Sequence, residues 1–384
     1  MKRNQRSPIF DSRKKRRLAK AAKLSSCGSS SLRSAGSTAP PTFLDELIEP
    51  VLAQLSISQI DALKQDSKLW ASMLQTPSLR RACAVVHPRV FGLVRWNPKR
   101  DAIMTSIFDL KSSEWVDIQL TEFPRDKDYE DAMSAADGGL VCFVPRIGEK
   151  LSALPILVYN PLTNDRNFIP KCERSPFGKK RLILVQLVMD EEMKCYKVML
   201  VYGESYNEAS GAVVYDSRTG LWTKKNDGVV FGAGNTLLHG QCNPRIFDCS
   251  HKSMHGIGDL YEHPRSFSSS KNHLFVLEEI TTPPGKFKLS EYTLSPREIT
   301  VRDLKTLSGP SEEEGYDSVL LACNGFILLA WDYHDEEDDD GHDQIFKLHD
   351  IAGNKEYNIN ADSITPLEIL QRSLICDLRW EAIP

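Results

Sequence analysis

The chain lacks the sequence signals of a membrane protein or a secreted protein. No stretch of its 384 residues approaches the roughly eighteen consecutive apolar residues that a membrane-spanning helix needs. The N-terminus has no apolar stretch of the secretory type. The nine cysteines are scattered without short paired spacings, which indicates reduced thiols and not a disulfide framework. We therefore expect a protein of the nucleus, the cytoplasm or both, with no membrane partner.

Motifs of catalytic and metal sites are also missing. The sequence has no Gly-x-Ser-x-Gly elbow, no Walker loop and no His-Glu-x-x-His. The one metal-like cluster consists of Cys242, Cys249, His251 and His255, and its cysteines lack the short spacing of a structural zinc site. The acidic run 335–340 has Lys347 where a calcium loop requires a bidentate Glu. The sequence therefore predicts no metal, no cofactor and no catalysis.

Charge is distributed unevenly along the chain. Residues 1–41 hold eleven Lys or Arg and one acid, whereas the remainder holds 37 basic and 51 acidic residues. The first segment is rich in Ser, Lys, Arg, Ala and Gly, so we expect a disordered basic tail. Its cluster Arg13–Arg17 is either a nuclear localisation signal or simply a solvated basic run. An acidic remainder argues against nucleic acid as a partner.

A helical pattern opens the acidic part of the chain. Apolar residues at offsets 0, 3, 4, 7, 8 and 11 predict one apolar helix face formed by Leu44, Leu47, Ile48, Val51, Leu52 and Leu55. Ser58 predicts the cap of a second helix, and Pro77 predicts the end of a third one that carries Leu69 and Trp70. Three short helices of this kind cannot bury all their apolar side chains alone, so another surface must cover some of them.

This segment resembles an F-box, which docks onto the Skp adaptor of cullin-RING ubiquitin ligases. Lys68 and Trp70 occupy the Lys-x-Trp positions of the F-box pattern, and Pro77-Ser78 matches the end of this pattern. The departures from the pattern are Leu44, Pro50, Ser56 and Asp66. The resemblance implies an adaptor-binding set consisting of Leu44, Leu47, Ile48, Val51, Leu52, Leu55, Ile60, Leu63 and Trp70.

Beyond Ala82 the hydrophobic period changes from helical spacing to short runs between turns. About a dozen such runs, with no long helical stretch between them, predict an all-β array. The predicted strands are Val90–Val94, Ile103–Phe108, Leu140–Val144, Ile156–Tyr159, Leu182–Val188, Val198–Tyr202, Ala212–Tyr215, Val229–Phe231, His273–Leu277, Ser318–Ala322, Phe326–Trp331 and Ile345–Leu348.

An internal repeat runs through these strands. Its plan is an aromatic that ends a strand, an Asp that opens a turn, and a Trp seven residues after the first aromatic. Its clearest copies run from Phe108 to Trp115 and from Tyr215 to Trp222, and weaker copies begin at Tyr159, Tyr292 and His349. A unit of about 50 residues built from such hairpins is a kelch-type propeller blade.

Taken together, the two parts resemble plant-type F-box and kelch-repeat proteins. The resemblance implies a mainly β kelch-type propeller of six blades, in which one eroded blade lies between Lys224 and Pro264. The expected domains are a disordered tail (1–41), a three-helix F-box (42–82) and the propeller (83–384). Structural roles in the blades are implied for Asp109, Trp115, Gly138, Gly139, Asn160, Asp216, Trp222 and Asp350.

The function implied is that of a substrate-recognition subunit of a Skp–cullin–F-box ubiquitin ligase. The helices would bind the Skp adaptor and through it cullin, and the propeller would bind an unknown protein target. The subunit itself would not be an enzyme. Two alternatives stay open, namely a non-catalytic propeller scaffold with a degenerate F-box, and a propeller-fold enzyme or lectin.

Overall fold

A computed structural model describes most of the chain beyond residue 42. The described residues are 43–88, 90–97, 102–109, 114–119, 132–147, 150–151, 154–170, 172, 180–190, 192, 194–205, 208–227, 229–233, 244–249, 251–256, 264–270, 273–280, 285–294, 299–308, 316–323, 326–334, 342–351, 353–359 and 373–384. The chain divides into a unit of residues 1–46 and a unit of residues 47–384. Among the described residues, no helix is long and apolar enough to cross a membrane. The predicted tail, residues 1–41, lies outside them.

Four helices open the described part of the chain. They are α2 (Phe43–Ala53), α3 (Ile57–Asp66), α4 (Lys68–Met73) and α5 (Pro77–Val86). The three predicted helices correspond to α2, α3 and α4, and α4 ends before Pro77, but a fourth helix that was not predicted, α5, begins at this proline. Proline fits the first helical position because the N–H that it lacks would have no partner inside the helix. Pro50 lies inside α2, which therefore does not begin at this proline.

The cap of α3 differs from the predicted one. Ser56, and not Ser58, is the N-cap residue. Its Oγ accepts a hydrogen bond from the backbone N–H of Gln59 at 3.3 Å, and the Gln59 side chain accepts one from the Ser56 N–H at 2.9 Å. Two N–H groups without helical partners are thus satisfied reciprocally, which stabilises the start of the helix.

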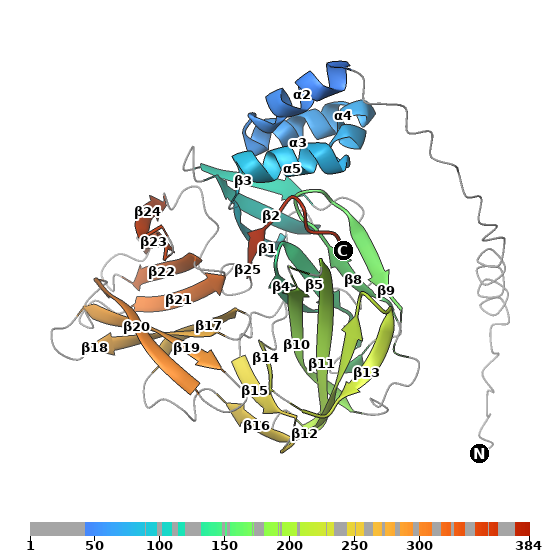
Figure 1. The fold of residues 1–384 in the computed structure, drawn as a ribbon. Coiled ribbons are helices and arrows are strands. Elements are labelled where there is room, and N and C mark those ends of the chain that lie inside the picture. The colour runs from blue at the N-terminus through green and yellow to red at the C-terminus, as the bar shows by residue number, and fades with distance from the viewer. Residues whose placement is uncertain are drawn as a thin grey trace, which may run out of the picture. The chain divides into compact units, whose positions relative to one another are not determined.

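The remaining elements are strands (Figure 1). They form five antiparallel sheets of four or more strands and an additional two-stranded ribbon. The first sheet contains β25 (Leu374–Leu378), β1 (Val90–Asn97), β2 (Ala102–Asp109) and β3 (Glu114–Gln119). The second contains β4 (Met133–Asp137), β5 (Leu140–Val144), β8 (Ile156–Tyr159) and β9 (Arg166–Ile169). The ribbon pairs β6 (Arg146–Ile147) with β7 (Lys150–Leu151).

The third sheet has seven strands. They are β13 (Leu221–Lys225), β12 (Glu208–Asp216), β11 (Cys195–Ser205), β10 (Arg181–Asp190), β14 (Val229–Ala233), β15 (Pro244–Asp248) and β16 (Ser253–Gly256). The fourth contains β17 (Pro264–Ser270), β18 (His273–Ile280), β19 (Lys286–Leu294) and β20 (Ile299–Ser308). The fifth contains β21 (Tyr316–Cys323), β22 (Phe326–His334), β23 (His342–Asp350) and β24 (Lys355–Ile359). Each of the twelve predicted strands lies within one of these strands.

The sheets form a closed five-bladed propeller. One edge strand of each four-stranded sheet takes part in a ring of contacts that runs through β25, β4, β10, β14, β17, β21 and back to β25. The ring closes within the first sheet, where β25 from the end of the described chain pairs with β1, with Val90 opposite Leu378. Full closure of this kind leaves few exposed strand edges.

The prediction of six blades is wrong. In the segment where an eroded blade was expected, β14, β15 and β16 form a three-stranded meander. Ala233 of β14 lies opposite Val185 of β10, so this meander extends the third sheet to seven strands. A separate four-stranded blade is not formed there by the described residues.

The internal repeat marks the same hairpin in every sheet. Its five copies connect β2 to β3, β8 to β9, β12 to β13, β19 to β20 and β23 to β24, which are the third and fourth strands of each blade. In the two clearest copies the aromatics lie directly opposite each other, Phe108 beside Trp115 and Tyr215 beside Trp222. Their ring centroids are 5.2 and 5.4 Å apart, a distance at which aromatic pairs attract.

A buried histidine in the fifth blade makes the fold sensitive to acid. His349 is 2% exposed, and burial lowers its pKa to about 4. The Glu356 carboxylate, 3.4 Å away, raises this pKa, whereas the charges of Lys305 and Lys347 lower it further. In the unfolded chain the imidazole takes up its proton near pH 6.5. We therefore expect the free energy of unfolding to fall by about 3 kcal/mol as the pH drops from 6.5 to 4.

Urea unfolding at several pH values measures this loss, and His349→Leu should remove most of it. The matched control is His251→Leu, because His251 is an exposed histidine. Burial raises the pKa of Glu356, but His349, Lys305 and Lys347 together lower it, so Glu356 adds its own loss of stability below about pH 4.5. His349→Leu removes the His349 part of this effect, so the comparison is made between pH 6.5 and about 4.5. If the free energy of unfolding of His349→Leu falls over this pH range as steeply as that of the wild type, the acid sensitivity does not come from His349.

Candidate functional site

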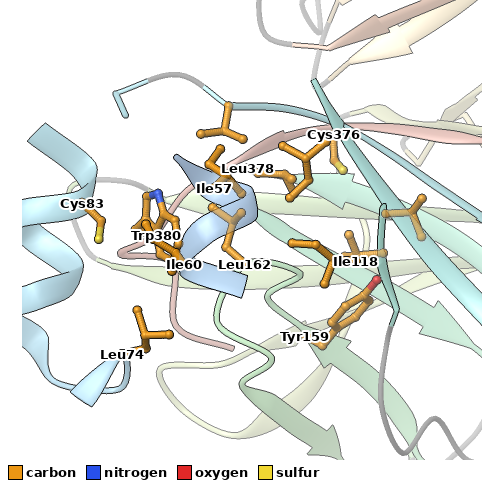
Figure 2. Close-up of a cluster of buried hydrophobic side chains, with 14 of the residues drawn as sticks. Ile57, Ile60, Leu74, Cys83, Ile118, Tyr159, Leu162, Cys376, Leu378 and Trp380 are labelled. Carbon is orange, nitrogen blue, oxygen red and sulfur yellow. The ribbon is translucent and has the colours of Figure 1, made fainter. Parts of the chain in front are cut away.

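The helices and the propeller share one apolar core. Figure 2 shows helical side chains converging with strand side chains and with Trp380 from the segment after β25. The buried helical members are Ala53, Ile57, Ile60, Leu74, Leu79 and Cys83. They pack in one cluster with residues of the first two blades, including Ile107, Tyr159 and Leu378. The propeller therefore supplies part of the cover that the short helices need.

Polar contacts add to this junction. The Arg80 guanidinium of α5 lies 2.6 Å from the Asp165 carboxylate in the β8–β9 turn, and its Nε donates to the Leu74 carbonyl at 3.2 Å. Both side chains are largely buried, at 10% and 22% exposure. Such a charge pair is costly to break, because a lone buried charge would remain. Its planar hydrogen bonds also restrict the orientation of α5 on the blade.

Some of the predicted adaptor-binding residues face solvent and others do not. Val51 on α2 is 65% exposed, and Ile48, Leu52, Leu55, Leu63 and Trp70 are half-buried. Ile60 is only 4% exposed, because it packs into the shared core instead of facing solvent. The side chains of Leu44 and Leu47 lie outside the described residues.

Leu69 on α4 is an exposed apolar residue that the predicted set missed. It is 64% exposed, next to the half-buried Trp70. The sequence held a signal for it, because a helix as short as α4 cannot cover both of two adjacent large apolar residues. Leu69 therefore joins Val51 as an apolar side chain that the shared core leaves uncovered.

The blade-signature residue Asn160 holds the segment after β25 in place. Its Nδ2 donates to the carbonyl oxygens of Arg379 and Ala382, both at 2.8 Å, and its Oδ1 accepts from the Leu162 N–H at 2.9 Å. Trp380, between the two anchored residues, is 3% exposed. Asn160 thus connects a β8–β9 turn to the part of the chain that completes the shared core.

The other blade-signature residues shape turns. Gly138 and Gly139 form the β4–β5 turn with φ of +56° and +89°, the pattern of a tight two-residue hairpin turn that favours glycine. Asp216 and Asp350 accept backbone hydrogen bonds within their own turns, from Arg218 and Gly353, each at 2.9 Å. Trp115 and Trp222 pack across hairpins as described above, and Asp109 ends β2 with 6% exposure. These residues support the scaffold.

A groove of about 730 Å³ lies between α5 and the propeller. Its lining includes Arg81 and Ala84 of α5 and Met189 and Lys194 of the β10–β11 hairpin. The residues from Asp377 to Ile383 complete the lining. Pockets of roughly 300–1,000 Å³ are the usual size for bound ligands, so the groove is large enough to hold one.

Groups suited to metal or thiol chemistry were not found in the described part of the chain. No set of three His, Cys, Asp or Glu residues there could hold a metal ion. Six cysteines are free and buried, and burial, with the Glu49 charge, raises the pKa of the Cys83 thiol to about 11. A thiol of this kind is a poor nucleophile at neutral pH.

The metal-like cluster of the sequence is only partly described. Cys249 is buried, whereas His251 is exposed and its Nδ1 lies 2.6 Å from the Asp248 carboxylate. Cys242, the His255 side chain and the acidic run 335–340 lie outside the described residues.

Comparisons with known proteins give no family assignment. No family model and no curated protein matches the chain. Among solved structures it is similar to TolB from Acinetobacter baumannii, at 10% identity over 79% of this chain and 73% of that one, with a TM-score of 0.39. Oligogalacturonate lyase from Vibrio parahaemolyticus matches at 11% identity over 70% and 78% of the two chains, with a TM-score of 0.34. An exo-beta-1,3-galactanase from Phanerochaete chrysosporium matches at 13% identity over 61% and 64%, with a TM-score of 0.28.

A pair of glycine substitutions tests the packing of the β4–β5 turn against the anchored segment. A Cβ at Gly139 would lie 2.8 Å from the Arg379 Cβ and 2.9 Å from the Ala382 Cβ, whereas one at Gly220 would meet nothing within 4 Å. Both positions have positive φ, so each Ala costs about 1–2 kcal/mol of backbone strain. We expect thermal unfolding to report a larger loss for Gly139→Ala. Equal losses would mean that the contact contributes nothing.

Trp380 tests the shared core directly. Its Nε1 has no hydrogen-bond partner within the described chain, so Trp380→Phe removes no described hydrogen bond and should cost little. Trp380→Ala leaves a cavity between the helices and the blades and should lower the free energy of unfolding by about 3–5 kcal/mol. Denaturant unfolding compares the two. Similar values for both variants would refute this role of the indole.

Proposed function

We propose that the chain is a substrate-recognition subunit of a Skp–cullin–F-box ubiquitin ligase. The observation that supports this most is the exposure of Val51 and Leu69, at 65% and 64%, on helices that bury other apolar side chains, such as Ile57 and Leu79, against the propeller. Uncovered apolar side chains on a small helical surface favour a protein partner. The F-box pattern of the same segment, including Lys68 and Trp70, favours the Skp adaptor as this partner.

In this proposal the chain is not an enzyme and acts by proximity. The helices of an F-box bind the Skp adaptor, and through it cullin, while a kelch-type propeller holds the target. Because the helices and the blades share a core, a bound target would keep a set position relative to the adaptor. This raises the effective concentration of target lysines at the ubiquitin-loading enzyme without any chemistry by the chain itself. The basic cluster Arg13–Arg17 supports a location in the nucleus as well as the cytoplasm.

A second candidate is a propeller scaffold with a degenerate F-box. The burial of Ile57, Ile60 and Leu74 favours it, because these helical side chains already have cover within the same chain. The departures Pro50 and Asp66 favour it too. The two candidates differ in one respect, which is whether the exposed residues bind Skp.

Substitution of the exposed apolar pair separates the two candidates. Because Val51 and Leu69 face solvent, a Val51→Asp/Leu69→Asp double variant should unfold like the wild type. Charges at a hydrophobic contact should weaken capture of purified Skp adaptor about a hundredfold. Biolayer interferometry measures the capture, and circular dichroism measures the folding.

The matched control carries the same change at exposed apolar residues on outer blade strands. Leu221→Asp/Val301→Asp replaces side chains of 62% and 55% exposure and should leave Skp capture unchanged. Failure of the wild-type chain to capture Skp would exclude the ligase proposal and leave the scaffold.

A further inference from the structure

We infer that the groove between α5 and the propeller binds an acidic peptide segment of the target protein. This inference rests on the proposed function for one point, namely that the ligand is a protein. The groove itself does not involve Val51 or Leu69, so it can be tested separately from Skp capture.

The charge of the groove is opposite to that of the surrounding protein. Its lining has four basic side chains, which are Arg80, Arg81, Lys194 and Arg379, against the two acids Asp377 and Glu381. Residues 42–384 as a whole carry 37 basic and 51 acidic residues. A basic groove on an acidic protein attracts acidic segments locally and repels them elsewhere, which gives specificity.

Two of these cations are available to a ligand. Arg80 is held by Asp165, and Arg379 lies 2.9 Å from Asp377 through both Nε and a terminal nitrogen. Arg81 of α5 and Lys194 of the β10–β11 hairpin are both exposed, and neither has an ion pair among the residues that the structure describes. Carboxylates of a bound segment would pair with these two cations. Glu381 is the exposed acid of the lining and would limit how closely an acidic residue approaches that end.

Apolar side chains line the same groove. Ala84 and Met189 are half-buried, and Ile383 is 63% exposed. A volume of about 730 Å³ with apolar and charged lining suits a short extended peptide in which acidic and apolar residues occur together. The peptide would gain affinity from apolar burial and orientation from the two charges.

An array of random ten-residue peptides, probed with the full-length chain, tests the ligand class. We expect the bound peptides to be enriched in Asp and Glu together with Leu, Ile, Val or Phe. The basic segment 1–41 also attracts acidic peptides, so acidic enrichment reports the ligand class, and the groove variants described next assign the binding to the groove. No enrichment, or enrichment of basic peptides, would overturn the inference.

Fluorescence anisotropy with the best acidic peptide then places it in the groove. Arg81→Glu/Lys194→Glu should weaken binding about tenfold or more, and the affinity of the wild type should fall as salt rises. The matched control Arg218→Glu/Lys224→Glu makes the same charge change at exposed positions of the β12–β13 hairpin and should have no effect. An equal loss of peptide affinity in both variants would mean a general charge effect.

A competition experiment with citrate tests whether the groove binds peptides or any small anion. Displacement of the peptide by citrate at the peptide's own concentration would mean a small-anion site and not a peptide site.

Skp capture by the groove variant keeps the two proposals apart. Arg81→Glu/Lys194→Glu should capture Skp as the wild type does. If the wild type fails to bind Skp but binds acidic peptides through the groove, the ligase proposal fails and the groove inference stands. If Skp binds but no acidic peptide does, the groove inference fails alone.

Discussion

The packing of short helices onto the first two blades is the constraint on which the rest of the structure depends. Helices of six to eleven residues are marginal by themselves, and their stability comes from burying an apolar face. Leu79 and Cys83 of α5 find this cover in strand side chains and in Trp380. The same packing creates the groove along the other face of α5, and it leaves Val51 and Leu69 uncovered. The proposed partner surface and the proposed target site are thus both consequences of one core.

Closure of the propeller links the two ends of the described chain to this core. β25 completes the first blade, and the segment that follows it is anchored by Asn160 before Trp380 enters the cluster. Chain positions separated by more than 200 residues therefore meet at the junction. A substitution in the segment after β25 would therefore change the packing of the blades and of the helices together.

The sequence predicted the middle strands of the blades well and the outer strands poorly, for a physical reason. The predicted strands, such as Leu140–Val144, are continuous apolar runs because both faces are buried between blades. The fourth strands are different, since β13 is mostly exposed and contains two lysines in five residues. Only the aromatic of the turn repeat marked its position. The predicted number of blades was wrong because the pairing of β14 with β10 leaves no local sequence signal in either strand.

By itself, the sequence determined the order of the parts, the helical start, the β-rich remainder and the hairpin that recurs in each blade. These features depend on local periodicity and turn chemistry, which neighbouring residues carry. The tertiary structure decided which apolar side chains of the helices stay exposed, that the blades number five, and that Arg81 and Lys194 face one groove. Those outcomes depend on contacts between residues far apart in the chain, and no local pattern encodes such contacts.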